Sequence, residues 1–268
     1  MTPFAGYWEE VGEGEPVLCL SGFASALWML RDLLEPLQNQ GRFILPDNRG
    51  MGRSPPASAP YRLADLANDA LQLLDALQQP TFSVIGLSMG GFVAQWLALA
   101  APERVKRLVL LCTASSGPAF KPLFPLAPRQ QVAEIYRLPD RERITAALSP
   151  ALFPLLASRY PEVYAHAFRQ RMAHLEAAEQ VLLQYDAVAD FLESPLDLGR
   201  ISCPTLVLAG EEDRLVPLAN GQRLAQSIPH ARLIVIPDTD HLFFLEKQAE
   251  VAAIIARFLR QPGAGLLG

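Results

Sequence analysis

Short apolar runs alternate along the chain with longer stretches in which apolar residues recur every three or four positions. The first pattern predicts buried strands and the second predicts amphipathic helices. The predicted strands cover residues 4–11, 17–20, 43–46, 82–85, 107–111, 205–209 and 232–236. The predicted helices between them cover residues 27–39, 63–77, 89–101, 219–226 and 246–259. This alternation indicates an α/β fold with a mostly parallel central sheet and helices on both faces.

The alternation stops between residues 113 and 204, where about ninety residues replace the short crossover that usually joins two such strands. This stretch is rich in proline and carries helix-like patterns at residues 129–137, 140–148, 162–175 and 177–192. We therefore predict a core domain formed by residues 1–113 and 204–268, and a helical cap formed by residues 114–203. Insertions after a strand lie where α/β proteins bind ligands, so the cap is expected to cover a site.

Composition narrows the class of protein. Half of the 268 residues are hydrophobic and 19% are charged, which is typical of a soluble globular protein. The net charge of −5 does not favour binding to nucleic acid or to an anionic membrane. The uncharged stretch 81–101 is long enough to span a bilayer, but its glycines and Ser88 favour a buried strand, a turn and a helix. The sequence begins without a signal-peptide pattern, and Cys19, Cys112 and Cys203 lie beside strand-like runs, which together favour reduced thiols and a cytoplasmic location.

One serine stands between a predicted strand and a predicted helix, in the sequence Gly86-Leu87-Ser88-Met89-Gly90. Gly-x-Ser-x-Gly in this setting is the nucleophile elbow, in which a sharp turn strains the serine backbone and holds its hydroxyl clear of the sheet. Side chains at positions 86 and 90 would clash with the neighbouring backbone, which explains the glycines. The motif occurs by chance in about a tenth of chains this long, so partner residues must support it.

A serine nucleophile needs a histidine base and an acid that orients it, in the chain order Ser, acid, His. The segment "LVLAGEEDRLVP" places Asp213 after one strand, and "LIVIPDTDHLFFLEK" places His241 after another. Both loops lie at the sheet edge that carries Ser88. The weaker candidates for the acid are Glu211, Glu212, Asp238 and Asp240, and the other histidines, His166, His174 and His230, are interpreted as structural or solvated. No cluster of histidines or cysteines predicts a metal, and no cofactor is expected.

Five segments together resemble the α/β-hydrolase fold superfamily over almost the whole chain: "LCLSGF", "PDNRGMGRS", "GLSMGGFVAQWLAL", "LVLAGEEDRLVP" and "DTDHLFFLE". The similarity is greatest to small capped carboxylesterases and lactonases such as 3-oxoadipate enol-lactonase. The resemblance implies an α/β-hydrolase fold with Ser88 as nucleophile, Asp213 as acid and His241 as base. It also implies an oxyanion hole formed by the backbone N–H groups of Phe23 and Met89. Ser21 stands where relatives usually carry histidine, so the loop that holds Phe23 is expected to be secured differently.

These features predict a serine hydrolase that cleaves a carboxylic ester or lactone of a small molecule through an acyl-serine intermediate. Two alternatives stay open: a thioesterase or C–C bond hydrolase with the same triad, and a non-catalytic ligand-binding protein on the same fold. The expected apolar lining of the pocket includes Trp28, Phe124, Phe153 and Phe243. Six arginines of the cap are candidates for binding substrate: Arg129, Arg137, Arg141, Arg143, Arg169 and Arg171. An arginine among them that pointed into the pocket would pair with a substrate carboxylate.

Overall fold

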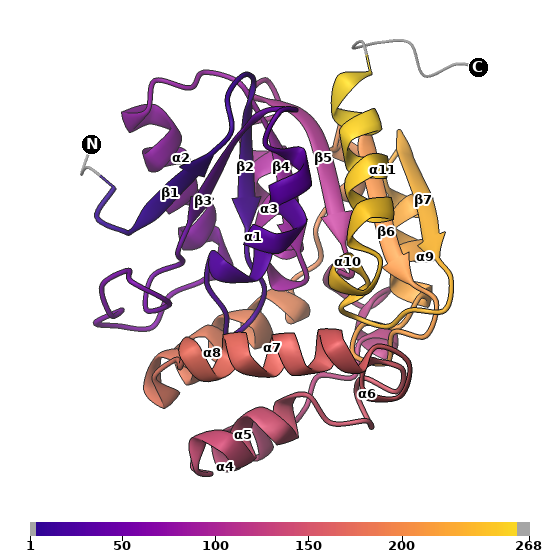
Figure 1. The fold of residues 1–268 in the computed structure, drawn as a ribbon. Helices are drawn as coiled ribbons and strands as arrows, with labels where there is room; N and C mark the ends of the chain where they lie inside the picture. The colour runs from indigo at the N-terminus through magenta and orange to yellow at the C-terminus, as the bar shows by residue number, and fades with distance from the viewer. Residues whose placement is uncertain (1–3, 262–268) are drawn as a thin grey trace.

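The computed structural model describes residues 4–261, and within them seven strands form one sheet in the order β1-β3-β2-β4-β5-β6-β7 (Figure 1). Strand β1 pairs antiparallel with β3, and every other neighbouring pair is parallel. This confirms the predicted α/β-hydrolase fold with a mostly parallel sheet. The strands are β1 (Trp8–Val11), β2 (Pro16–Leu20), β3 (Arg42–Pro46), β4 (Phe82–Leu87), β5 (Val105–Leu111), β6 (Thr205–Gly210) and β7 (Ala231–Ile236).

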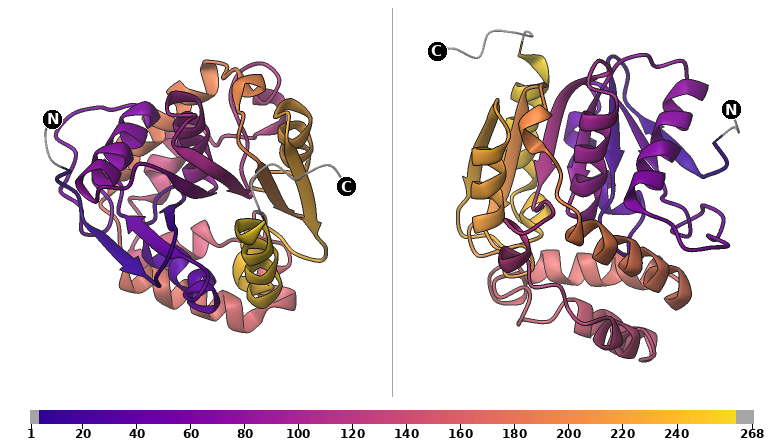
Figure 2. Two further views of the ribbon diagram at one scale, coloured as in Figure 1. Left: turned by 90° about the horizontal axis from the view of Figure 1, so that it is seen from above. Right: turned by 180° about the vertical axis from the view of Figure 1, so that it is seen from behind.

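Helices cover both faces of the sheet (Figure 2). One face packs against α2 (Leu63–Ala76), α3 (Met89–Ala100) and α9 (Ala219–Ser227). The other face packs against α1 (Trp28–Leu34), the 3-10 helix η1 (Glu35–Leu37), α10 (Phe243–Glu246) and α11 (Gln248–Arg260).

Successive residues of β5 contribute side chains to the hydrophobic cores on opposite faces of the sheet. The side chains of Leu108 and Leu110 pack on the face covered by α2, α3 and α9, and those of Val109 and Leu111 pack on the opposite face. All four are fully buried. The strand segments covered on both sides are mostly apolar, which is why their sequences read as nearly continuous hydrophobic runs.

The insertion between β5 and β6 forms helices at one end of the sheet. In Figure 1 the arrowheads of the parallel strands point toward them, so these helices stand over the carboxyl ends of those strands. The segment contains η2 (Lys121–Leu123), α4 (Arg129–Ile135), α5 (Asp140–Ala147), α6 (Leu156–Arg159), α7 (Pro161–Ala173), α8 (Ala178–Glu193) and η3 (Leu198–Arg200). The four helices predicted there are present, with ends that differ by one or two residues.

Most element boundaries differ from the prediction by no more than two residues, and three differences stand out. The first strand begins at Trp8 instead of residue 4. The helix predicted over residues 27–39 ends as an α-helix at Leu34, because Pro36 has no N–H to donate one turn back. The last helix is preceded by a separate short helix, α10. Within residues 4–261 no helix is both long and apolar enough to cross a membrane, and the uncharged stretch 81–101 forms β4 and α3.

Candidate active site

Ser88 joins β4 to α3 in a conformation that L-amino acids rarely adopt, with φ 53° and ψ −117°. Its N–H donates to the Leu111 carbonyl at 2.8 Å, and its carbonyl accepts from Thr113 Oγ1 at 2.7 Å. These two bonds to the adjoining strand hold the strained turn in place. Ser88 is partly exposed in a run of otherwise buried residues, so its side chain stands clear of the sheet.

The glycines around Ser88 are required by close backbone contacts. A Cβ at Gly86 would lie 2.5 Å from the Gly90 carbonyl oxygen, and a Cβ at Gly90 would lie 2.2 Å from the Leu20 carbonyl oxygen. Both distances are far shorter than any non-bonded contact. Strand, turn and helix therefore pack together only when these positions carry no side chain.

Asp213 and His241 follow β6 and β7 and form a buried pair. His241 Nδ1 lies 2.7 Å from Asp213 Oδ2, and Asp213 Oδ1 accepts the N–H groups of Leu215 at 2.9 Å and Val216 at 2.8 Å. Both Asp213 oxygens are thus engaged, which fixes the carboxylate against the ring. The neighbouring Glu211 and Glu212 are exposed.

The electrostatics of this pair favour an imidazole that takes up a proton. Burial lowers the pKa of His241, but the Asp213 carboxylate and the neighbouring Cys112 together outweigh it, so the pKa of the ring stands well above its usual value. With Nδ1 bonded to Asp213, Nε2 is the ring nitrogen left to receive a proton.

Ser88 and His241 both line a cavity of about 410 Å³ between the sheet and the inserted helices. Phe23 and Met89 line it as well, and so do two of the expected aromatic residues, Phe124 and Phe153. Helices α4, α5, α7 and α8 complete its wall.

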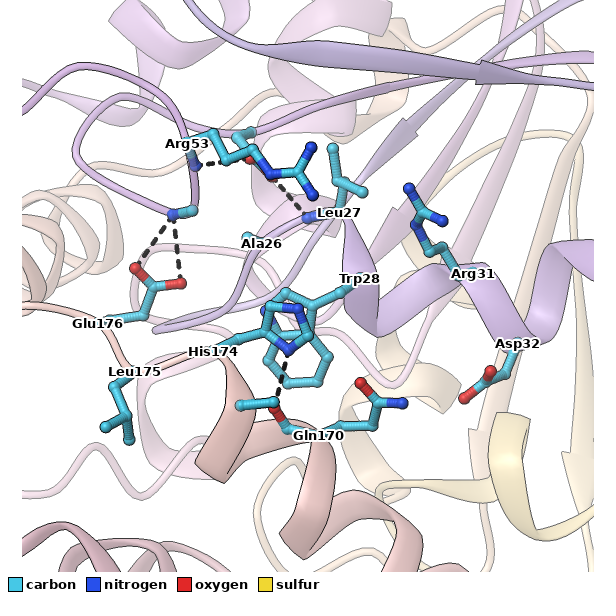
Figure 3. A pocket seen from close by; sticks show the side chains of 13 residues that line it. Ala26, Leu27, Trp28, Arg31, Asp32, Arg53, Gln170, His174, Leu175 and Glu176 are labelled. Atoms are coloured by element: carbon cyan, nitrogen blue, oxygen red, sulfur yellow. Dashed lines mark hydrogen bonds between the residues drawn. The ribbon is translucent and has the colours of Figure 1, made fainter.

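The structure places Trp28 and Phe243 outside this cavity. Trp28 lines a second cavity of about 490 Å³, where its ring stacks on His174 with centroids 5.1 Å apart (Figure 3). Phe243 is fully buried beside Phe244 beneath the cavity, while Leu242 and Phe244 reach its wall. The prediction that these two residues line the pocket is wrong, because the sequence does not determine the direction in which their short helices turn them.

The loop after β2 brings Phe23 close to the serine, since a Cβ at Gly22 would lie 3.4 Å from the Cβ of Ser88. Ser25 Oγ donates to the Gly22 carbonyl at 3.0 Å, and the Ala24 N–H donates to Gln184 Oε1 of α8 at 2.7 Å. Gln184 is fully buried. A residue of the inserted segment thus secures the loop, and no sequence pattern indicated it.

Met89 is the first residue of α3, so its N–H has no acceptor within the helix. The amide N–H groups of a helix N-terminus favour a negative charge. Met89 and Phe23, the two predicted oxyanion donors, both line the cavity that holds Ser88.

Asp240, one of the weaker candidates for the acid, is fully buried next to His241 and contacts the half-buried Glu246, which the sequence did not single out. Asp240 Oδ2 accepts the N–H groups of Leu155 at 3.1 Å and Leu156 at 3.2 Å, at the start of α6. The Asp240 N–H donates to Glu246 Oε2 at 3.1 Å. Burial, followed by the neighbouring Asp240, raises the pKa of Glu246 to about 9, so this carboxyl is neutral at pH 7. The pair ties the His241 loop to the inserted segment.

The described residues contain no group of three or more His, Cys, Asp or Glu side chains arranged to hold a metal ion. Cys19, Cys112 and Cys203 are free and buried. Burial raises the pKa of each thiol, to about 11 for Cys203.

Residues 15–248 match the family model described as alpha/beta hydrolase fold. The poly(3-hydroxyalkanoate) depolymerase of Ectopseudomonas oleovorans is 32% identical over 92% of this chain and 84% of its own length. The 3-oxoadipate enol-lactonase 2 of Acinetobacter baylyi is 31% identical over 91% of this chain and 90% of its own. The structure of a thermophilic esterase from Thermogutta terrifontis with malate bound is similar at 30% identity and TM-score 0.81, covering 95% and 92% of the two chains. The resemblance seen in the sequence is thereby confirmed, and the chain is an enzyme of the α/β-hydrolase fold family.

Proposed function

We propose that this enzyme cleaves a carboxylic ester or lactone of a small molecule through an acyl-serine intermediate. The observation that carries the proposal is that strained Ser88 opens onto the same cavity as His241, whose Nδ1 lies 2.7 Å from Asp213. This arrangement supports the assignment of Ser88, His241 and Asp213 as nucleophile, base and acid of a catalytic triad.

In the proposed mechanism Ser88 Oγ attacks the substrate carbonyl while His241 Nε2 takes its proton. Asp213 holds the ring in the required tautomer and stabilises the imidazolium that forms. The N–H groups of Phe23 and Met89 stabilise the oxyanion. The alkoxide leaves with the proton from His241, and the ring then activates water to hydrolyse the acyl-serine.

The cavity supports a small-molecule substrate, because about 410 Å³ lies within the range of ligand pockets. We assign residues 1–113 and 204–268 to a catalytic core and residues 114–203 to a cap that shapes the pocket. The names of the similar depolymerase, enol-lactonase and esterase favour ester and lactone substrates over thioesters. The free, buried cysteines agree with a cytoplasmic location, which we also propose.

Turnover by matched variants tests the proposal. Ser88→Ala should abolish hydrolysis of aryl esters, lactones and thioesters alike, with kcat lower by about 10⁶, and a fluorophosphonate should label the wild type but not the variant. Ser58→Ala, which removes an exposed hydroxyl, serves as the control and should behave as the wild type. Residual activity of a tenth in Ser88→Ala would refute the serine mechanism, and a wild type that resists the label would favour the non-catalytic alternative.

A further inference from the structure

The six arginines of the inserted segment differ sharply in their surroundings. Arg129 forms a double hydrogen bond with Asp186, at 2.6 and 3.0 Å, and Arg143 pairs with Asp140 at 2.8 Å. Three others are exposed to solvent: Arg137, Arg141 and Arg169. Arg171 differs from all of these, because it lines the cavity that contains Ser88.

Arg171 lies in the last turn of α7 without a carboxylate partner. Its Nε is fully buried and has no hydrogen-bond partner, and within the described residues no carboxylate oxygen comes within 4.0 Å of its guanidinium. Burial lowers the pKa of Arg171, and the nearby Tyr136 and Glu176 oppose that effect. Glu176 is itself engaged, accepting the Gly52 N–H at 3.0 Å. Among the described residues the guanidinium therefore has no ion-pair partner within 4.0 Å, and Glu176 compensates its charge only from a greater distance.

No negative charge lines the cavity to balance it. Among its described lining residues there is no Asp or Glu, and Arg171 is the one permanently charged side chain. Most of the wall is apolar, with Phe124, Phe153 and Leu152 among its members. A cation in apolar surroundings interacts strongly with an anion that enters, because little water screens the pair.

We propose that the enzyme's substrate carries a carboxylate, which Arg171 binds while Ser88 attacks the ester or lactone carbonyl. This inference rests on the proposed hydrolase function and specifies its substrate class, an acidic ester or lactone. The planar guanidinium offers two parallel N–H donors that match the two oxygens of a carboxylate. Tyr136, which lines the same cavity, provides a hydroxyl that can donate to the same group.

Stability separates a binding role from a structural one. A partly buried cation without a partner destabilises the free protein, so Arg171→Met should leave the melting temperature unchanged or raise it. An arginine that instead held α7 in place would lower the melting temperature when replaced. Arg169→Gln, at an exposed position of the same helix, serves as the control.

The substrate test compares mono-4-nitrophenyl glutarate with its methyl-capped diester, which has the same acyl chain without the charge. We expect the wild type to prefer the acid by about 30-fold or more in kcat/KM, as expected for a desolvated charge pair. Arg171→Gln should remove this preference, because kcat/KM should fall at least about tenfold more on the acid than on the neutral diester. Arg171→Lys should restore part of the preference, and Arg169→Gln should retain it. Equal activity of the wild type on both esters, or an equal loss on both in Arg171→Gln, would overturn the proposal.

Calorimetric titration with glutarate tests the subsite without turnover. Binding should be measurable with the wild type and with Ser88→Ala, weaker by at least about tenfold in Arg171→Gln, and unchanged in Arg169→Gln. If the fluorophosphonate fails to label Ser88 while glutarate still binds through Arg171, the hydrolase function is wrong and the anion subsite stands. If labelling succeeds and Arg171→Gln binds glutarate as the wild type does, the subsite is wrong and the hydrolase function stands.

Discussion

Replacing Gln184 by methionine should lower catalysis without touching the triad. Gln184 lies on α8, and its Oε1 accepts the N–H of Ala24, the residue that follows Phe23 in the loop beside Ser88. The bond is 2.7 Å long and fully buried, so its loss leaves a backbone donor without a partner. Ala24 also has φ 49°, a conformation that needs external support.

The magnitudes follow from these contacts. An unsatisfied buried N–H costs about 1–3 kcal/mol of stability, which in a chain of this size lowers the melting temperature by about 2–10 °C. Loss of one oxyanion donor typically lowers kcat by about 10²–10³. Since the loop would move without losing the donor entirely, Gln184→Met should lower kcat by at least about tenfold, with a small change in KM.

Gln180 provides a matched control on the same helix. Its Oε1 accepts the Ala57 N–H at 2.8 Å, which is again a buried amide bonded to the backbone of the core. Gln180→Met should destabilise the protein similarly but leave kcat within about threefold of the wild type. Thermal melts and steady-state kinetics on an aryl ester measure both quantities. Equal effects of the two variants on kcat would show that Gln184 has no particular role in holding the loop of Phe23.

Three further results are expected around His241. Asp213→Asn should lower kcat by about 10⁴, whereas Glu211→Gln should be mild; the reverse order in steady-state assays would identify the wrong acid. Because the pKa of His241 is raised and the base must be neutral, kcat/KM should fall as pH decreases through a value above about 6.5, and an acidic limb at or below that pH would contradict the role of Asp213. The pKa of Glu246 is raised from about 4.5 to about 9 on folding. Protonated Glu246 therefore contributes its full share to the free energy of unfolding below about pH 4.5, and this contribution is lost as pH rises to about 9. Denaturant unfolding should therefore show Glu246→Gln to be less sensitive to pH than the wild type over that interval, and identical slopes would refute the buried neutral carboxyl.

The central sheet was largely predictable from the sequence, because its strands are buried on both faces and therefore read as continuous apolar runs. Within the sheet, β6 and β7 begin and end within one residue of the predicted bounds. Helix α6 was missed because it has only four residues and its first N–H groups are held by Asp240, more than eighty positions away. A local pattern contains no information about such a contact.

The placement of Asp213 and His241 was predictable for a topological reason. Loops that follow parallel strands meet at one sheet edge, so the order of strands brought both residues to the side of Ser88. The roles of Gln184 and Arg171 depend instead on how α7 and α8 dock on the core. Sequence periodicity predicted those helices but not the faces that they turn toward the cavity.

Formation of an acyl group on Ser88 is the central claim, and mass spectrometry of the intact protein tests it most directly. We would mix the enzyme with excess mono-4-nitrophenyl glutarate, quench it in acid within the first turnover, and map any added mass by peptide sequencing. One acyl group per chain should appear on the peptide that contains Ser88, and none should appear on Ser88→Ala. Turnover of the ester with no mass added at Ser88, or with the acyl group on another residue, would contradict it.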